Sequence, residues 1–273
     1  MAKNIIFYFS GTGNALKLAR DIAGDAGDTD IVFMGEGSGL TQNYEQVGFV
    51  FPCYAGGAPK IVLQFLRKLD TSALSPSVYF FTVVSCNAWG GNSAHMVHAV
   101  LKRKGGFLSY ANVVPTVGNY IPKYPPEKSF VDNSLELTLK EADKKAQIIA
   151  AAIRDKARLE PDKWSLGKAI FYRVGNLYFG IMAKKLAVSG KCVNCGICVR
   201  LCPVGNIRQG KDRPEFRNKD CTQCMACLQW CPQKAIQCSK GTASRNRYHN
   251  PAVTLQDLLR DRGQLHIIEG TAP

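Results

Sequence analysis

Two stretches of the chain follow one pattern: CVNCGICVRLCP at residues 192–203 and CTQCMACLQWCP at residues 221–232. Both read C-x2-C-x2-C-x3-C-P, and each cysteine of the first stretch recurs 29 residues later in the second. Pro203 and Ile207 recur at the same offset, as Pro232 and Ile236. Six positions at one constant offset predict two copies of a small unit, related by a pseudo-two-fold axis.

The spacing of these cysteines favours iron–sulfur clusters over zinc. Structural zinc sites usually take four ligands as two separated pairs, whereas each repeat here offers three cysteines from one short loop. In the two-cluster bacterial pattern, the fourth cysteine of each run binds the other cluster. The sequence therefore predicts two 4Fe–4S clusters, one held by Cys192, Cys195, Cys198 and Cys231 and the other by Cys202, Cys221, Cys224 and Cys227. Because all irons are then coordinated, we expect outer-sphere electron transfer.

Over about residues 190–240 the chain resembles the bacterial ferredoxins that carry two 4Fe–4S clusters. The resemblance implies a small α+β ferredoxin-like domain. An odd total of eleven cysteines argues against a disulfide framework, and the start of the chain shows no signal peptide. A cytoplasmic protein is therefore expected. Cys238 lies outside the repeats, and we expect it to be a packed or free thiol.

The first part of the chain alternates strand-like and helix-like segments. The 273 residues are 46% hydrophobic, which excludes a mainly disordered chain. Alternating strands and helices predict a doubly wound parallel sheet of five strands with helices on both faces. The expected strands are residues 5–9, 31–33, 47–51, 78–84 and 107–114, and the expected helices are residues 14–23, 58–69, 93–104 and 135–158.

A phosphate-binding loop is expected directly after the first strand, at Ser10-Gly11-Thr12-Gly13-Asn14. Backbone amides at a helix N-terminus favour an anion, and glycines let the backbone approach it. A dinucleotide fingerprint fits less well, because Leu16 stands where the third glycine is required. The loop resembles the FMN-phosphate motif of flavodoxins, with Ala15 in place of the usual threonine. That resemblance implies a flavodoxin-like fold that binds FMN.

Two glycine-rich segments follow the third and fourth expected strands. In a flavodoxin-like sheet, ligands bind at the carboxyl ends of the strands near the switch point. Tyr54 and Trp89 are candidates to stack on the flavin ring, with packing at the rim of the site as the alternative. The candidate ring-binding residues are Tyr54, Ala55, Gly56 and Gly57 in the first segment and Ser85, Cys86, Asn87, Trp89, Gly90 and Gly91 in the second.

Nearly the whole chain resembles the flavodoxin–ferredoxin fusion family of anaerobic bacteria and archaea. The resemblance includes residues 119–124, NYIPKY, after the fifth strand and residues 247–251, RYHNP, near the end. The first segment is a candidate loop over the flavin, and the second a candidate tail docked on the cluster domain. The expected domains are an FMN-binding domain at residues 1–158, a bridge at 159–190, a two-cluster ferredoxin domain at 191–240 and a C-terminal tail at 241–273.

The bridge is basic and aromatic. Residues 163–191 contain no acidic residue, and the chain as a whole carries a formal net charge of +14. We expect one or two helices that pack the two blocks together; a peripheral contact with an anionic membrane surface or an acidic partner is the alternative. No stretch is apolar over the roughly 18 residues that a spanning helix needs.

These features predict an electron-transfer protein that relays electrons between FMN and two 4Fe–4S clusters. An FMN-dependent reductase fed by its own clusters is the first alternative, and a redox sensor or nucleic-acid binder is the second. The clusters and FMN would offset only part of the positive charge, so acidic redox proteins are the expected partners. No nucleic-acid partner is expected, because the basic residues form no recognisable nucleic-acid-binding motif.

Overall fold

The structure is a computed structural model, and it describes residues 2–35, 39–123, 135–217 and 221–262. Contacts divide the chain into two compact units. The N-terminal unit comprises Met1–Ser10, Asn14–Gly118 and Phe130–Asn176, and the C-terminal unit comprises Gly11–Gly13, Asn119–Ser129 and Leu177–Pro273. The three residues at the centre of the expected phosphate loop therefore belong to the C-terminal unit, among residues that lie far from them in sequence.

The N-terminal unit is built on a five-stranded, all-parallel sheet. Its strands are β1 (Asn4–Tyr8), β2 (Thr29–Phe33), β3 (Gln46–Pro52), β4 (Tyr79–Cys86) and β5 (Leu108–Pro115). Their spatial order is β2-β1-β3-β4-β5, which is the flavodoxin-like order. The sequence-based prediction of a flavodoxin-like doubly wound sheet is confirmed.

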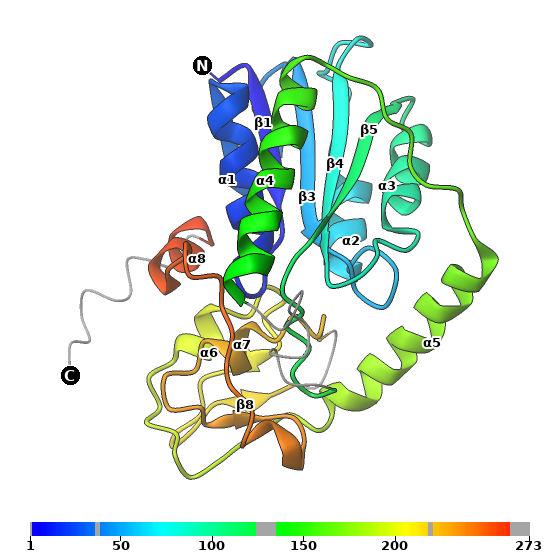
Figure 1. Ribbon diagram of the computed structural model, residues 1–273. Helices are drawn as coiled ribbons and strands as arrows, with labels where there is room; N and C mark the ends of the chain where they lie inside the picture. Colours follow the sequence, from blue (N-terminus) through cyan, green and yellow to red (C-terminus); the bar gives the residue numbers. More distant parts are fainter. Residues whose placement is uncertain (1, 36–38, 124–134, 218–220, 263–273) are drawn as a thin grey trace. The chain divides into compact units, whose positions relative to one another are not determined.

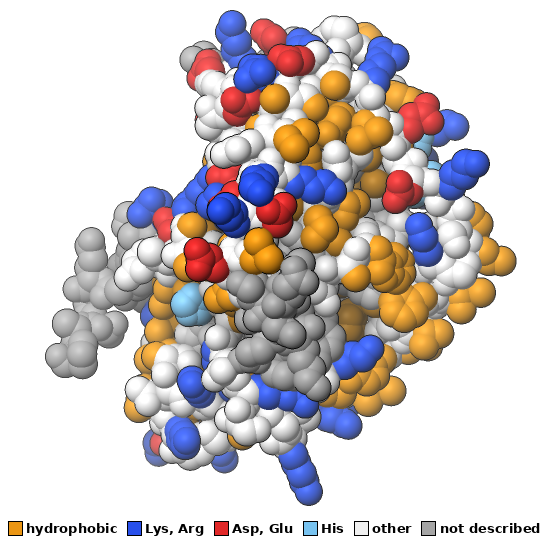
Figure 2. Space-filling view, viewed as in Figure 1, with side chains coloured by type: hydrophobic (Ala, Val, Ile, Leu, Met, Phe, Trp, Pro, Cys, Tyr) orange, Lys and Arg blue, Asp and Glu red, His pale blue; other side chains and the backbone are white. Residues whose placement is uncertain are grey.

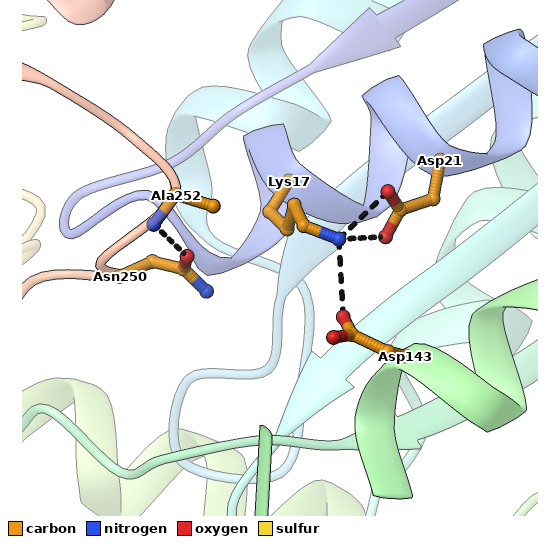
Figure 3. Close-up of polar contacts among 5 residues, drawn as sticks. All are labelled: Lys17, Asp21, Asp143, Asn250 and Ala252. Carbon is orange, nitrogen blue, oxygen red and sulfur yellow. Dashed lines mark hydrogen bonds and ion pairs between the residues drawn. The ribbon is translucent and has the colours of Figure 1, made fainter. Parts of the chain in front are cut away.

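Helices cover both faces of this sheet, with α1 and α4 on one face and α2 and α3 on the other (Figure 1). Every residue of the central strand β4 is therefore buried, which explains its unbroken apolar run. The helices are α1 (Asn14–Ala26), α2 (Lys60–Lys68), α3 (Ser93–Lys102) and α4 (Leu135–Arg154). On the outer side of α1, Lys17 bonds both carboxylate oxygens of Asp21 (2.7 Å) and reaches Asp143 on α4 (3.0 Å; Figure 3).

The predicted helix at residues 135–158 was too long at its C-terminal end. Helix α4 ends at Arg154, and Lys156 takes a left-handed backbone conformation (φ 51°). Leu159 then runs beside β5, where its N–H donates to Ser109 and its carbonyl accepts from Ala111. The helix stops because the chain turns back to complete the edge of the sheet.

The C-terminal unit shows the predicted internal repeat in its backbone. Helix α6 (Ile197–Arg200) corresponds to α7 (Ala226–Gln229), and β7 (Ile207–Arg208) to β9 (Ile236–Gln237), each at the offset of the cysteines. The positive-φ residues correspond as well: Asn194 with Gln223, Gly196 with Met225, and Gly205 with Lys234. Two short antiparallel pairs complete the fold, β7 with β8 (Glu215–Phe216) and β9 with β6 (Ala187–Val188).

The remaining elements follow the bridge and the repeats. Helix α5 (Leu166–Ala183) occupies most of the predicted bridge, and only Met182 and Ala183 are buried in it. Cys238 is fully buried in the C-terminal core and donates to the Met182 carbonyl. A short 3-10 helix, η3 (Lys240–Thr242), and helix α8 (Leu255–Asp261) follow, the latter capped by Thr254. None of the helices within the described ranges has the length and hydropathy needed to cross a bilayer.

Candidate cofactor sites

The eight repeat cysteines of the C-terminal unit line two separate cavities. One is lined by Cys192, Cys195, Cys198 and Cys231, and the other by Cys202, Cys221, Cys224 and Cys227. Each cavity thus takes three cysteines from one repeat and the fourth from the other repeat. Four thiolates around one cavity are the donor set that a 4Fe–4S cluster requires, so the residues present fit that group.

Backbone N–H groups point at several of these sulfurs. Asn206 and Ala235 donate to the sulfurs of Cys202 (3.1 Å) and Cys231 (3.2 Å), at equivalent positions of the two repeats. Asn194 donates to Cys192 (3.4 Å). Hydrogen bonds to cluster sulfurs stabilise the more negative, reduced state and so tune the reduction potential.

The cysteine pKa values show why bound iron matters for this unit. Burial, together with the neighbouring thiolates, raises the pKa of Cys198 to about 12 and that of Cys221 to about 11. Without a metal the buried thiols stay protonated. Iron coordination favours the thiolate form, so cluster binding and folding of this unit are coupled.

The expected phosphate loop is held by side chains and backbone of the C-terminal unit. The indole Nε1 of Trp230 donates to the Gly11 carbonyl (3.0 Å), and the backbone N–H of Asn250 donates to the Thr12 carbonyl (2.8 Å). The Asn119 side-chain amide donates to the Thr12 hydroxyl (2.6 Å). These contacts fix both peptide groups and the side chain of Thr12.

The same contacts leave loop amides available to a ligand. Because the peptide group is planar and trans, binding the Gly11 carbonyl turns the Thr12 N–H to the opposite side. Within the part of the chain that the structure describes, no acceptor meets the N–H of Gly11 or of Thr12. Both residues are buried. Buried donors without acceptors suit an anion such as the phosphate of FMN.

Close packing explains the two glycines of the loop. A Cβ atom on Gly11 would lie 2.2 Å from the Cys224 carbonyl oxygen, and one on Gly13 would lie 2.9 Å from Val253. Gly13 also has a φ of 99°. Any larger residue would therefore displace the loop.

Residues that hold this loop were missing from the sequence-based site. Trp230 precedes the last cysteine of the second repeat, and Asn119 and Asn250 lie in the two segments noted only for their resemblance. The side chain of Asn250 accepts from the Ala252 N–H (3.0 Å), which shapes the turn that presents its own backbone N–H (Figure 3). His249 stacks on Trp230, with ring centroids 4.2 Å apart. These contacts supply a physical reason for both segments.

The two candidate ring-binding segments meet in the N-terminal unit, at the carboxyl ends of the adjacent strands β3 and β4. Tyr54 and Gly57 exchange backbone hydrogen bonds around a tight turn, and the Asn92 N–H donates to the Gly56 carbonyl (2.8 Å). A Cβ atom on Gly91 would lie 2.0 Å from the Gly56 carbonyl oxygen. The two segments therefore form one continuous surface.

Residues of α5 lie against this surface. Trp89 packs on Phe171, with ring centroids 5.7 Å apart, and the Tyr172 hydroxyl donates to the Ala58 carbonyl (2.9 Å). The Tyr172 ring closes over Gly57, where a Cβ atom would lie 2.3 Å from it. Sequence analysis missed these α5 residues, because nothing local marks a helix residue that packs on a distant loop.

The remaining members of the second segment differ in exposure. Ser85 is buried, and its carbonyl accepts from Cys53 (2.8 Å), while Asn87 is exposed. Cys86 is buried, and burial together with the nearby Cys53 raises its pKa to about 12. Gly90 and Gly91 line a cavity of about 230 Å³ together with His95.

Comparison with known proteins identifies the second half of this architecture. Residues 191–236 match the family model of the 4Fe-4S dicluster domain. One component of the ion-translocating oxidoreductase complex from Methanosarcina acetivorans is 44% identical over 46 residues, which is 17% of this chain and 17% of that protein. The curated relative is thus matched over a small part of its length.

Solved structures similar to this chain include flavodoxins. The Fusobacterium nucleatum flavodoxin bound to flavin mononucleotide is 15% identical and has a TM-score of 0.39, covering 58% of this chain and 100% of that one. The two-electron reduced Megasphaera elsdenii flavodoxin is 16% identical and has a TM-score of 0.34, covering 55% and 99%. Our assignment of the fold rests on strand order and direction.

The chain thus combines a flavodoxin-like sheet with a ferredoxin-type segment for two 4Fe–4S clusters. That combination defines the class of iron–sulfur electron-transfer proteins.

Proposed function

We propose that this chain relays electrons between FMN, bound at the loop of residues 10–14, and its two 4Fe–4S clusters. When bound, FMN supplies a centre that takes two electrons and gives them up one at a time, and each cluster carries one electron. The pair of clusters therefore matches the two-electron capacity of one flavin. The chain would convert between one-electron and two-electron steps.

One observation carries this proposal: the expected phosphate loop touches the backbone of a cluster cysteine. The contact is that of Gly11 with the carbonyl of Cys224, one of the cysteines of the second cavity. Trp230, which binds the Gly11 carbonyl, directly precedes Cys231 of the first cavity. The loop thus has a short connection to the cysteines of both cavities.

The chain's own residues have three roles in this proposal. The N–H groups of Gly11 and Thr12 bind the phosphate, together with the hydroxyls of Ser10 and Thr12. Trp230, Asn119 and Asn250 hold the loop in the conformation that exposes those N–H groups. The Tyr54–Gly57 and Ser85–Gly91 segments contact the flavin ring.

Redox proteins are the proposed partners. The relative from Methanosarcina acetivorans is named as part of an oxidoreductase complex, which supports transfer of electrons to or from another protein. The net charge of +14 favours an acidic surface on that partner, because opposite charges accelerate encounter. A cytoplasmic location stays a prediction.

Cofactor content tests the proposal first. Protein purified without oxygen is expected to hold about eight irons, eight sulfides and one FMN per chain. Adding dithionite stepwise should bleach cluster and flavin absorbance in one sample. Eight irons without flavin, even after incubation with FMN, would remove the flavin half of the relay.

A conservative variant of the loop then tests where FMN binds. Thr12→Val keeps the shape of the side chain and removes its hydroxyl, so FMN affinity should fall about tenfold or more, as expected for one hydrogen bond to a charged group. Thr82→Val is the matched control, because Thr82 is also buried and its hydroxyl donates to the Phe49 carbonyl (2.8 Å). Equal FMN affinities for the two variants would contradict binding at this loop.

A further inference from the structure

One face of α5 carries a continuous row of exposed aliphatic side chains: Leu166, Ile170, Val174, Leu177 and Ile181. Their spacing of four, four, three and four residues keeps them within one narrow face of an α-helix. Each is between 55% and 72% exposed. We call this row the aliphatic stripe.

The stripe lies on one continuous helix, so its alignment follows from helix geometry alone. Figure 2 shows hydrophobic side chains gathered along α5, at the right of the view. Exposed apolar rows of this length are uncommon on the surface of a globular protein, and they mark a contact with a partner or a membrane. Trp164, just before the helix, adds a further exposed aromatic ring.

Charge distinguishes between the occupants of such a stripe. Six basic residues and no acidic one lie between positions 163 and 191: Lys163, Lys168, Arg173, Lys184, Lys185 and Lys191. Pairing of two copies along this helix would bring like charges together, which opposes self-association. An anionic surface would instead be attracted along the whole segment.

We propose that α5 docks the protein on an anionic lipid bilayer, with the helix lying in the plane of the interface. The aliphatic stripe would enter the boundary between headgroups and acyl chains, and the lysines would bind the anionic headgroups. About 27 Å of helix, for 18 residues at 1.5 Å each, would lie along the surface. Membrane docking of this kind is independent of the proposed FMN relay, and it places the electron carrier beside membrane-bound acceptors.

Vesicle flotation with the anaerobically purified holoprotein tests this inference. The protein should float with vesicles of phosphatidylcholine containing about one third phosphatidylserine, and remain below vesicles of pure phosphatidylcholine. Binding should weaken strongly as salt is raised, because screening removes the attraction of the lysines. Absence of flotation with the anionic vesicles at low salt would overturn the proposal.

Two pairs of variants separate the stripe from general hydrophobicity and charge. Ile170→Gln with Leu177→Gln should lower vesicle affinity about tenfold or more, since two side chains then no longer enter the bilayer. Ile148→Gln on α4 is the control, because Ile148 is 70% exposed but lies outside the stripe. Lys184→Glu with Lys185→Glu should also lower affinity at least about tenfold, and Lys102→Glu with Arg103→Glu is the control with the same charge change.

Each outcome decides the inference. Loss of binding in the α5 variants alone, with iron content unchanged in all of them, supports membrane docking by α5. Equal losses in the control variants would assign binding to net charge and overturn it. Dimers of the wild type that the Gln variants abolish, without vesicle binding, would assign the stripe to a second copy of the chain. Vesicle-independent retention on an acidic redox protein would assign it to that partner.

Discussion

The indole N–H of Trp230 donates a hydrogen bond to the backbone carbonyl of Gly11, 219 positions earlier in the sequence, over 3.0 Å. Trp230 also stacks on His249 and is mostly buried. One side chain of the second cysteine repeat thus fixes a peptide group of the expected FMN-phosphate loop. The hydrogen bond couples the conformation of that loop to the cluster-bearing unit.

Replacing Trp230 with Phe isolates this hydrogen bond. Phe keeps an aromatic ring against His249 but removes the donor, so the Gly11 carbonyl is left without its partner. We expect FMN affinity to fall about fivefold, the effect of about 1 kcal/mol, while iron content stays unchanged. Titration of the FMN-free protein with FMN, followed by flavin fluorescence, measures this change.

Trp164→Phe is the matched control for that variant, because Trp164 is exposed and lies outside the loop contacts. It should leave FMN affinity at the wild-type value. Wild-type affinity in Trp230→Phe as well would show that the hydrogen bond does not position the loop.

The thiol of Cys86 should be chemically inert in the folded protein. Burial and the nearby Cys53 raise its pKa to about 12, so at pH 8 only about one molecule in ten thousand carries the thiolate. Because the raised pKa lies above the working range, its reactivity should rise about tenfold for each pH unit up to that value. Iodoacetamide labelling of the native holoprotein, followed by peptide mass spectrometry, checks this.

Full labelling of Cys86 after unfolding is the positive control for that experiment. Labelling of Cys86 in the native protein at the rate of a free thiol would contradict its burial, and would reopen a redox role for it beside the flavin segments.

Local sequence predicted the parts of the molecule that depend on local pattern. The five strands were found because buried parallel strands such as β4 are continuous apolar runs. The repeat was found because its cysteines recur at one offset, and the structure repeats α6 as α7 at that same offset. The ends of elements were less predictable: the pairing of Leu159 with Ser109, which follows the end of α4, joins residues 50 positions apart.

Long-range contacts account for what the sequence left out of the site. Asn119 reaches Thr12 across 107 positions, and Trp230 reaches Gly11 across 219. Hydrogen bonds of this kind leave no periodic or spacing signal, so both partners read as ordinary loop residues. Likewise, the basic and aromatic composition of the bridge predicted a helix, but only the structure shows that Leu166 and Leu177 face outward on it.

Removal of Lys17 should lower stability modestly. Its ammonium group joins α1 to α4 through Asp21 and Asp143, and its side chain is one quarter exposed. Burial acts to lower the pKa of Lys17, but the hydrogen bonds to the two carboxylates outweigh it and the pKa is raised above 10.5. Burial also raises the pKa of Asp21, so desolvation offsets part of the attraction. We expect Lys17→Met to cost about 1 kcal/mol, or about 2–4 °C in the thermal midpoint.

The pH dependence of that difference follows from the raised pKa of Lys17. The stabilisation is fully present below the unfolded-state pKa of 10.5 and is lost as pH rises through the higher folded-state pKa. Thermal midpoints of wild type and Lys17→Met should therefore differ by a constant amount from neutral pH up to about pH 10 and converge above it. Lys144→Met, which breaks an exposed pair with Glu141, should shift the midpoint by less than about 1 °C.

Cysteine pairs can test whether each cluster draws its fourth ligand from the opposite repeat. Cys231 belongs to the second repeat but lines the cavity of Cys192, Cys195 and Cys198. Cys192→Ser with Cys231→Ser should therefore damage one cluster only, leaving about four of eight irons per chain. Cys221→Ser with Cys231→Ser, which changes two cysteines of one repeat, should instead damage both clusters, because Cys221 lines the other cavity. If each repeat held its own cluster, the two double variants would exchange their iron contents. Cys238→Ser should retain about eight irons, since that buried thiol bonds the Met182 carbonyl outside both cavities.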